Sequence, residues 1–464
     1  MDQDQFLLYD HQKPIRLRAE RVAVYLQGEI IESYSEDNAV YYLFFYKYQF
    51  LTAVKATRLR RRSFIEKAFK RGMVFNAPHP FIKELLSSNH PCQILSFNPL
   101  LDKLEKHYTP QEKAFILTFF ESFIPKKQLF NEIKAVFYHY NRKGQTFLGY
   151  KIIRILMDFA PNHSLVEYFA NDIKVQKYAD LYNKNAEKIL AEDFIFAEKA
   201  LYYRKKKDSC FQQLTERLEK ESRWIDLIAL FSCKLTSSPS TDYYYPLIKL
   251  LEAHFDEYET MSFLEALSSK LPEFRPLQQN LFQHYIKHHK IEAVSHMMKN
   301  HDFELNSNQV EIFGDLLEQV DPEEDLIEPE MLHTVLGPVM NMYPEKADNL
   351  LTKYVISLLK TEELSSIQEW LRPFNENYKN LQIIRKIDTM QELSNDPDQM
   401  QTLGELYYEF RQLNQAVECF SWQTELNPTD PKPLRWLAKV YGEMGKTQES
   451  EAYRQQCINL QKLA

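Results

Sequence analysis

Apolar residues recur with helical spacing along most of this chain. From Thr109 onward, apolar positions three and four residues apart alternate with short polar breaks. Thr109 is a favourable N-cap and Pro110 suits a first helical turn, so a helix is predicted to begin there. The pattern therefore predicts a mainly helical protein in which consecutive helices pack against one another as hairpins.

The N-terminal part of the chain has a different pattern. Residues 21–26 and 29–34 are rich in β-favouring side chains, and the short turn between them ends in glycine, which predicts a β-hairpin. Residues 5–9 are a further candidate strand. The aromatic run at 39–54, AVYYLFFYKYQFLTAV, fits either strands or a buried helix, and its periodicity does not decide between them.

Two segments at the end of the chain, 397–430 and 431–464, share a register of 34 residues. The matched positions are Met400 with Leu434, Leu403 with Leu437, and Tyr407 with Tyr441. This pattern resembles the tetratricopeptide (TPR) repeat family, whose unit is a helical hairpin of that length. The resemblance implies a stack of hairpins with a curved groove that binds another protein.

In the TPR family, the first helix of each repeat lines the groove. The resemblance therefore implies that the partner-binding residues are the positions of those helices that do not face the core: Gln401, Glu405, Tyr408, Arg435 and Lys439. Their mixed charge and aromatic ring suit a peptide or helix of another protein. An ordinary solvated helix face would have a similar composition. The full set of residues by which some TPR proteins clamp a C-terminal carboxylate is missing, so that activity is not implied.

A weaker match to the same offsets lies upstream, at residues 130–163. Starting from Ile133, the matched positions are Val136, Tyr140, Gly149, Ile153 and Pro161. The segment is interpreted as a degenerate TPR-like hairpin, although Phe137 stands where a small residue is expected. An ordinary pair of packed helices is the alternative. Residues 164–310 read as further helices without a 34-residue register, which favours an irregular α-solenoid.

Four parts are therefore expected along the chain. They are a small N-terminal β-containing (α+β) domain at 1–108, an irregular solenoid of helical hairpins at 109–314, an acidic linker at 315–331, and a C-terminal helical domain at 332–464 that ends in the two TPR repeats. The linker is predicted because this segment is rich in Asp and Glu, contains no Lys or Arg, and is interrupted by Pro322 and Pro329.

The most basic stretch of the chain is Lys55–Arg71, in which Glu66 is the one acidic residue. Read as a helix, it places Ile65, Ala68 and Phe69 on one stripe and the arginines on the other side. The candidate anion-binding residues are Arg58, Arg60, Arg61 and Arg62. The stretch is interpreted as a solvated face that pairs with acids of this chain. The alternatives are a contact with nucleic acid or an anionic surface, and a contact with an acidic protein.

Composition narrows the classes of function. The 464 residues carry a net charge of −8, so nucleic-acid binding would require a local basic patch. There are 9 glycines and neither a GxGxxG nor a GxxxxGKS/T motif, which argues against a glycine-rich phosphate loop. The 5 scattered cysteines form no CxxC pair, and no signal peptide or membrane span of roughly 20 residues is recognised. A cytoplasmic protein with reduced thiols is expected.

Candidate catalytic and metal-binding groups are few. His284 and His288 are four residues apart and would share a helix face, but HYIKH lacks the glutamate of an HExxH motif and no third ligand is fixed by spacing. They are interpreted as exposed helix histidines. No GxSxG motif or recognisable nucleophilic cysteine occurs. No metal, cofactor or catalysis is therefore predicted.

These patterns predict a protein–protein interaction scaffold that binds a partner peptide or helix in a TPR groove. The alternative is a regulatory protein that contacts nucleic acid through Lys55–Arg71. The chain as a whole is also similar to poorly characterised cytosolic TPR proteins of Bacillus-type bacteria. That resemblance implies no biochemical activity.

Overall fold

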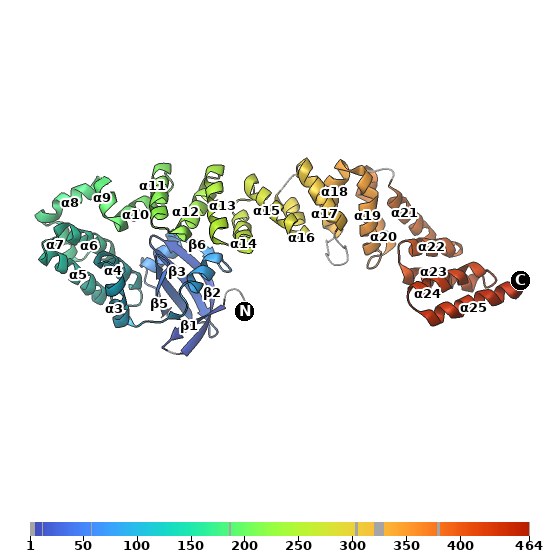
Figure 1. Ribbon diagram of the computed structural model, residues 1–464, viewed down its shortest axis with the longest axis horizontal. Helices are drawn as coiled ribbons and strands as arrows, with labels where there is room; N and C mark the ends of the chain where they lie inside the picture. The colour runs from blue at the N-terminus through green and yellow to red at the C-terminus, as the bar shows by residue number, and fades with distance from the viewer. Residues whose placement is uncertain are drawn as a thin grey trace. The chain divides into compact units, whose positions relative to one another are not determined.

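The computed structural model of the protein describes residues 5–11, 13–56, 58–184, 187–301, 305–319, 329–377 and 381–463. Over these residues the protein is mainly helical, with a β-sheet near the N-terminus (Figure 1). The chain divides into two compact units, Met1–Gln278 and Gln279–Ala464. The division falls inside the segment 109–314, which the sequence pattern assigns to one domain.

The sheet of the first unit is built mainly from consecutive antiparallel strands. The strands are β1 Gln5–Asp10, β2 Lys13–Tyr25, β3 Gly28–Ser35, β4 Val40–Tyr46, β5 Gln49–Ala56, β6 Met73–Asn76 and β7 Cys92–Gln93. Their order is β5-β4-β3-β2-β1-β7, and β6 also pairs with β2. β7 runs parallel to β1, whereas the other pairs are antiparallel. The predicted strand at 5–9 is confirmed as β1.

The predicted hairpin is confirmed, but its turn lies one residue earlier than the sequence suggests. Tyr25 pairs with Gly28, and Leu26 takes the left-handed conformation with φ of 57°. Gly28 itself belongs to β3. A Cβ atom at this glycine would lie 3.0 Å from the ring of Phe119, so the residue permits close packing of the sheet against that ring.

The ambiguous aromatic run forms two strands, β4 and β5. Lys47 and Tyr48 connect them, both with positive φ, at 46° and 69°. Such a two-residue turn matches the twist of paired strands, which explains why the run folds back as a hairpin instead of continuing as a helix.

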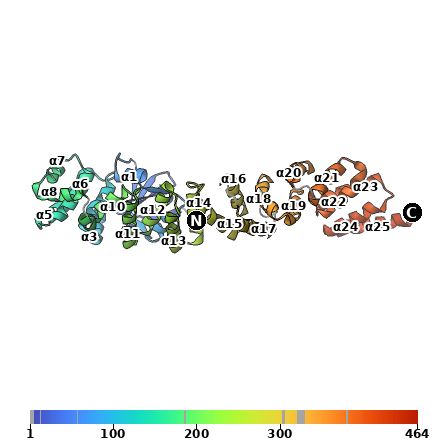
Figure 2. The same ribbon diagram turned by 90° about the horizontal axis from the view of Figure 1, so that it is seen from above.

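The helical prediction for the basic stretch is only partly correct. Helix α1, Phe64–Arg71, is preceded by the N-cap Ser63, whose side chain accepts a hydrogen bond from the Glu66 N–H. The four candidate arginines, 58 and 60–62, therefore precede the helix and lie outside it. α1 is visible in Figure 2 near α6 and α10, Thr146–Phe159 and Phe194–Tyr202, and residues of all three helices line one cavity.

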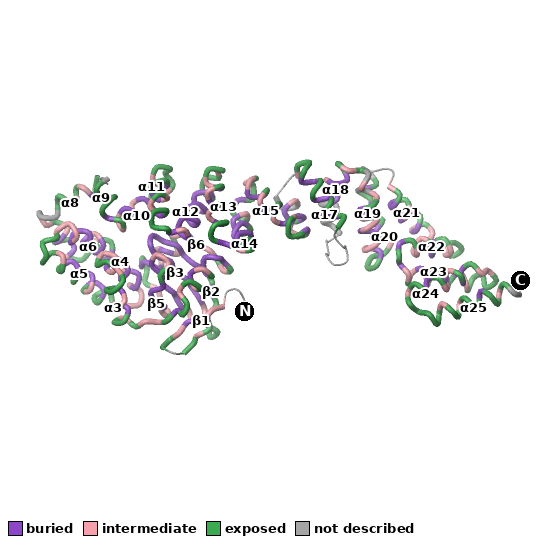
Figure 3. Tube along the Cα trace, viewed as in Figure 1, coloured by how far each residue is buried: buried purple, intermediate pink, exposed green. Residues whose placement is uncertain are grey.

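The remaining helices of the first unit surround the sheet and extend from it (Figure 1). They are α2 Pro80–Ser87, α3 Phe97–His107, α4 Pro110–Leu117, α5 Lys126–Arg142, α7 Ser164–Ala170, α8 Ile173–Asn183, α9 Glu187–Glu192, α11 Asp208–Lys220, α12 Trp224–Ser237, α13 Thr241–His254 and α14 Glu257–Ser268. Figure 3 shows that the central strands and α12 are largely buried. α15, Arg275–Lys287, crosses the division between the units.

A buried ionic network ties the sheet to the helices of the first unit. Arg223, at the start of α12, donates hydrogen bonds to both carboxylate oxygens of Glu198, at 2.6 and 3.0 Å, and of Asp226, at 2.9 and 3.1 Å. Arg223 also donates to the carbonyl oxygen of Leu26 at 2.8 Å. Gln27 donates to Glu198 from the same β-turn. The turn is thereby fixed against α10 and α12.

The second unit consists of helices. They are α16 Ile291–His301, α17 Ser307–Gln319, α18 Pro329–Met342, α19 Pro344–Leu358, α20 Leu364–Asn377, α21 Gln382–Ser394, α22 Met400–Glu409, α23 Leu413–Leu426, α24 Pro431–Glu443 and α25 Thr447–Leu463. The acidic segment 315–331 is helical at both ends, in α17 and α18, and its residues 320–328 lie outside the described residues.

Among the residues that the structure describes, five helical hairpins share one turn geometry, and the repeat pattern in the sequence marks three of them. In each, one residue adopts a left-handed conformation two positions before the second helix begins. These residues are Gly144 (φ 70°), Ser222 (54°), His289 (54°), Arg411 (57°) and Gly445 (77°). The N–H of the following residue always donates to the carbonyl five positions earlier, which forms a Schellman motif at the end of the first helix.

The same register carries a repeated side-chain pattern. The carbonyl of the Schellman motif belongs to Tyr140, Leu218, Tyr285, Tyr407 or Tyr441. The residue four positions before it is apolar and buried in all five hairpins: Val136, Leu214, Leu281, Leu403 and Leu437. The hairpin predicted at 130–163 is thus present as α5 and α6. Its unexpected Phe137 fits because a Cβ at Gly149 would lie 3.5 Å from the ring, an ordinary contact distance.

Candidate functional sites

The predicted partner-binding residues lie on α22 and α24, the first helices of the two repeats. Tyr408 of α22 and Lys439 of α24 are in contact, because the Lys439 Nζ lies 4.4 Å from the centroid of the tyrosine ring. The same ammonium lies 4.7 Å from the ring of Trp436, and the two rings are 5.0 Å apart. These three side chains are called the aromatic–lysine cluster below.

Trp436 was missed by sequence reasoning, although it connects the cluster to the core. Its ring stacks on Phe420 at 5.4 Å with an interplanar angle of 12°. Phe420 is fully buried among the core residues of the repeats. The signal that could have identified Trp436 is its position on the first helix directly beside Arg435. Core packing therefore holds the cluster in place.

On the face formed by α22 and α24, the acidic residues differ from the basic residues in whether they have a direct polar partner. The Tyr408 hydroxyl donates to Glu443, and the Gln401 side-chain amide donates to Glu405 at 2.7 Å. Arg435 and Lys439 are exposed, and neither forms an ion pair with a carboxylate in the described part of the chain. The face therefore presents basic groups whose charge is not neutralised by direct partners.

The four candidate anion-binding arginines are exposed, and they separate into two pairs. Arg61 and Arg62 line a cleft of about 770 Å³ in the first unit, whereas Arg58 and Arg60 do not. The backbone N–H of Arg60 donates to the Ser122 hydroxyl at 3.2 Å. The other basic residues of the cleft are Lys67, Lys70, Arg71, Lys126 and His163. We refer to this feature as the basic cleft.

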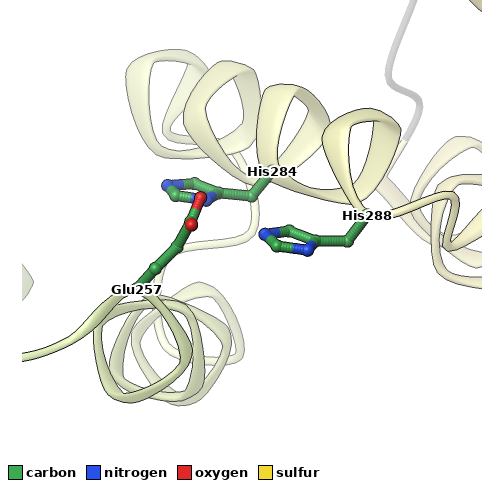
Figure 4. A group of neighbouring side chains, drawn as sticks. All are labelled: Glu257, His284 and His288. Carbon is green, nitrogen blue, oxygen red and sulfur yellow. The ribbon is translucent and has the colours of Figure 1, made fainter.

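The histidine pair lies on α15, as its spacing predicts. His284 and His288 project from one side of the helix end (Figure 4), and His288 directly follows the last helical residue. His284 is half-buried, so the expectation of two exposed histidines holds only for His288. Glu257, also drawn in Figure 4, belongs to the first unit. The pair alone supplies two donor groups, fewer than the three or four protein ligands of zinc sites.

Comparison with known proteins gives no family assignment. No protein-family model matches the chain, and no curated protein matches it. Among the helices described, none combines the length and the apolar character needed to cross a bilayer.

Proposed function

We propose that the protein is an interaction scaffold whose C-terminal repeats bind an acidic segment of another protein. The observation that carries this proposal is the aromatic–lysine cluster of Tyr408, Trp436 and Lys439, which lies on the first helices of two successive hairpins. Tryptophan, tyrosine and arginine are the residue types that most often dominate binding energy at protein interfaces. Arg435 places a guanidinium beside the cluster.

The charge of the face favours an acidic partner. Glu405 and Glu443 already accept hydrogen bonds from neighbouring side chains, whereas Arg435 and Lys439 have no carboxylate partner in the described residues. A partner carboxylate could form a charge-assisted hydrogen bond with Arg435 while the adjoining aromatic surface is covered. Such pairing would affect the orientation and the association rate of the partner more than its affinity.

The repeated Schellman turns support a TPR-like irregular α-solenoid as the frame of this scaffold. Arg411 and Gly445 occupy equivalent positions one repeat apart, and Gly144, Ser222 and His289 stand at the same position in earlier hairpins. A hairpin of this type cannot bury its apolar face alone and requires stacked neighbours. The proposed binding face would thus be a rigid surface formed by adjacent units, and the proposed setting is the cytoplasm.

A charge-reversal experiment tests this function. Arg435→Glu combined with Lys439→Glu should abolish recovery of the cross-linked partner from cells, because both changes oppose an acidic segment. The matched control, Lys446→Glu combined with Arg454→Glu, changes the net charge equally but alters the turn and α25. Control and wild-type chains should recover the same partner. Unchanged recovery by the Arg435/Lys439 variant, with helicity intact by circular dichroism, would exclude this face as the binding site.

A further inference from the structure

The basic cleft of the first unit differs in charge from the rest of this acidic chain. One wall is formed by α1 and the turn before it, which contribute Arg61, Arg62, Lys67 and Arg71. Lys126, at the start of α5, contributes from another element, and residues 158–163, which include the end of α6 and the turn after it, complete the lining. The cleft concentrates positive charge in a protein whose net charge is −8.

The acidic side chains of the cleft are already engaged. Glu66 forms an ion pair with Lys70 at 2.7 Å, and Asp158 forms one with Lys199. Glu121 accepts a hydrogen bond from the Phe64 backbone N–H at 2.7 Å. Burial raises the pKa of Glu121, whereas the nearby ammonium groups of Lys67 and Lys126 act in the opposite direction.

Apart from Lys70, the lysine and arginine side chains of the cleft have no direct carboxylate partner in the described part of the chain. Five cations of the lining form no ion pair with any carboxylate among the residues that the structure describes: Arg61, Arg62, Lys67, Arg71 and Lys126. The ammonium of Lys126 lies 4.8 Å from the centroid of the Phe159 ring, which holds it at the edge of the cleft. Five such cations around one concave surface repel one another and would be stabilised by a multivalent anion.

A narrower recess continues from the cleft into the first unit. The two cavities share Lys67, Glu121, Asp158 and Phe159, and the recess is also lined by aromatic rings, including Phe64 and Phe196. The volume of the recess is about 90 Å³. An apolar cavity that binds benzene has a volume of about 150 Å³. The recess is therefore too small for a nucleobase, and a ligand would occupy mainly the outer cleft.

We propose that the basic cleft binds the polyphosphate group of a small molecule, such as a nucleoside triphosphate or an inorganic polyphosphate. Arginine and lysine side chains from α1 and α5 would donate hydrogen bonds to the phosphate oxygens from different sides. The site needs no glycine-rich loop, because side chains take the place of backbone N–H groups. It is independent of the function proposed for the C-terminal repeats.

A compact ligand fits this site better than a nucleic-acid strand. An extended strand requires a basic track along the protein surface. Arg58 and Arg60, the other arginines of the stretch, do not line the cleft, so the charge is confined. The remainder of an acidic chain would also repel a long polyanion.

Isothermal titration calorimetry with the full-length chain tests the proposal, with ATP, sodium tripolyphosphate and orthophosphate as probes at low and physiological salt. Both polyphosphates should bind, and orthophosphate should bind much more weakly. Equal affinity for ATP and tripolyphosphate would assign recognition to the phosphate chain, whereas tighter ATP binding would add contacts from the nucleoside. Either result supports the cleft as a polyphosphate site.

Two matched variants locate the binding. Arg61→Glu with Lys126→Glu reverses one exposed cation on each side of the cleft and should weaken polyphosphate binding about 100-fold or more. Lys55→Glu with Arg58→Glu reverses two exposed cations of the same region outside the cleft, and should weaken it less than about threefold because of screening. Arg61→Gln with Lys126→Gln removes the same two charges without reversing them, and this variant is used for the same measurement if the first one misfolds.

Three outcomes would overturn the proposal. The first is the absence of polyphosphate binding by the wild-type chain at low salt. The second is an equal loss of binding in the cleft variant and the matched control, which would indicate general electrostatic attraction. The third is binding of a single-stranded RNA that tripolyphosphate does not displace, which would indicate a nucleic-acid surface.

Discussion

The sheet-centred first unit and the terminal repeats achieve a defined structure by different means. In the first unit, Arg223 hydrogen-bonds to Leu26, 197 positions away in the sequence, and Gln27 hydrogen-bonds to Glu198, 171 positions away. In the repeats, a hairpin with one left-handed residue recurs after 34 residues, and adjacent helices supply the core. The repeats rely on local turns and on contacts between neighbouring hairpins, whereas the first unit also uses polar contacts between residues far apart in the sequence.

This difference has consequences for stability. A buried ion pair contributes little net free energy compared with an apolar pair, but removal of one partner leaves an uncompensated charge. Stacked repeats instead distribute their stability over many similar local contacts. Substitutions in the Arg223 network should therefore have large effects, and substitutions in single turns should have small ones.

The largest effect is expected for Arg223→Met. The change leaves Glu198 and Asp226 buried without their cationic partner, which should lower the free energy of unfolding of the first unit by about 3–5 kcal/mol. Urea unfolding followed by hydrogen exchange and mass spectrometry separates the response of this unit from that of the repeats. Arg142→Met, at an exposed arginine of α5, is the control and should change stability by less than about 0.5 kcal/mol.

A pH-dependent effect is expected at Glu29, whose carboxylate faces the same network. Burial raises its pKa well above the ordinary value, and Asp226 adds to this effect while Arg223 opposes it. Burial likewise raises the pKa of Asp226 to about 6. The folded state therefore retains protons that the unfolded chain releases above about pH 4. This contribution to stability is complete below that pH and is lost as pH rises through the higher folded-state pKa values.

Glu29→Gln should reduce the loss of stability that accompanies a rise in pH. The glutamine oxygen can still accept the hydrogen bond that the Tyr48 N–H donates to Glu29 at 3.2 Å. Between pH 5 and 8, the unfolding free energy of the variant should decline less than that of the wild-type chain. The charged neighbours that bear on this titration are Asp226, Arg223 and Glu198. Parallel pH profiles for the two proteins would show that Glu29 is ionised in the folded state.

The smallest changes in the free energy of unfolding are expected at the equivalent turn positions Arg411 and Gly445, and the two changes should have opposite signs. The left-handed conformation costs a non-glycine residue about 1–2 kcal/mol. Glycine avoids this cost, but part of the gain is offset because glycine gives the unfolded chain more conformational freedom. Arg411→Gly should thus stabilise its repeat by about 0.5–1 kcal/mol, and Gly445→Ala should destabilise the next by about 1 kcal/mol. Thermal unfolding of both variants measures the difference, and a common sign would refute the equivalence of the two turns.

Local sequence signals predicted the elements that depend on local geometry. The N-terminal hairpin, the helices after Thr109 and the paired helices at the end of the chain follow from side-chain periodicity and turn residues. Helices were expected on either side of Ser222 and His289, but the left-handed turns at these two residues were not predicted, because neither residue is a glycine. The visible parts of the pattern in these two hairpins were the buried Leu214 and Leu281, and Tyr285 at the position of the repeat tyrosines.

The candidate sites were less predictable, because they depend on which elements meet in space. Arg61 and Arg62 were recognisable as basic residues, but the cleft also requires Lys126 and residues 158–163 from later helices. Similarly, Tyr408 and Lys439 were identified by their repeat positions, whereas their contact with each other and with Trp436 required the stacking of two hairpins. No sequence signal marked Arg223 as the centre of a buried network.

Site-specific photo-crosslinking tests the central claim, that the face formed by α22 and α24 binds an acidic segment of a partner. Benzoylphenylalanine is placed at Glu405, an exposed position of α22, or at Gln455, an exposed position of α25. Adducts from position 405 should map to one acidic segment of the partner and should disappear with Arg435→Glu and Lys439→Glu. Adducts that form equally from position 455, or that persist in the charge-reversal variant, would contradict it.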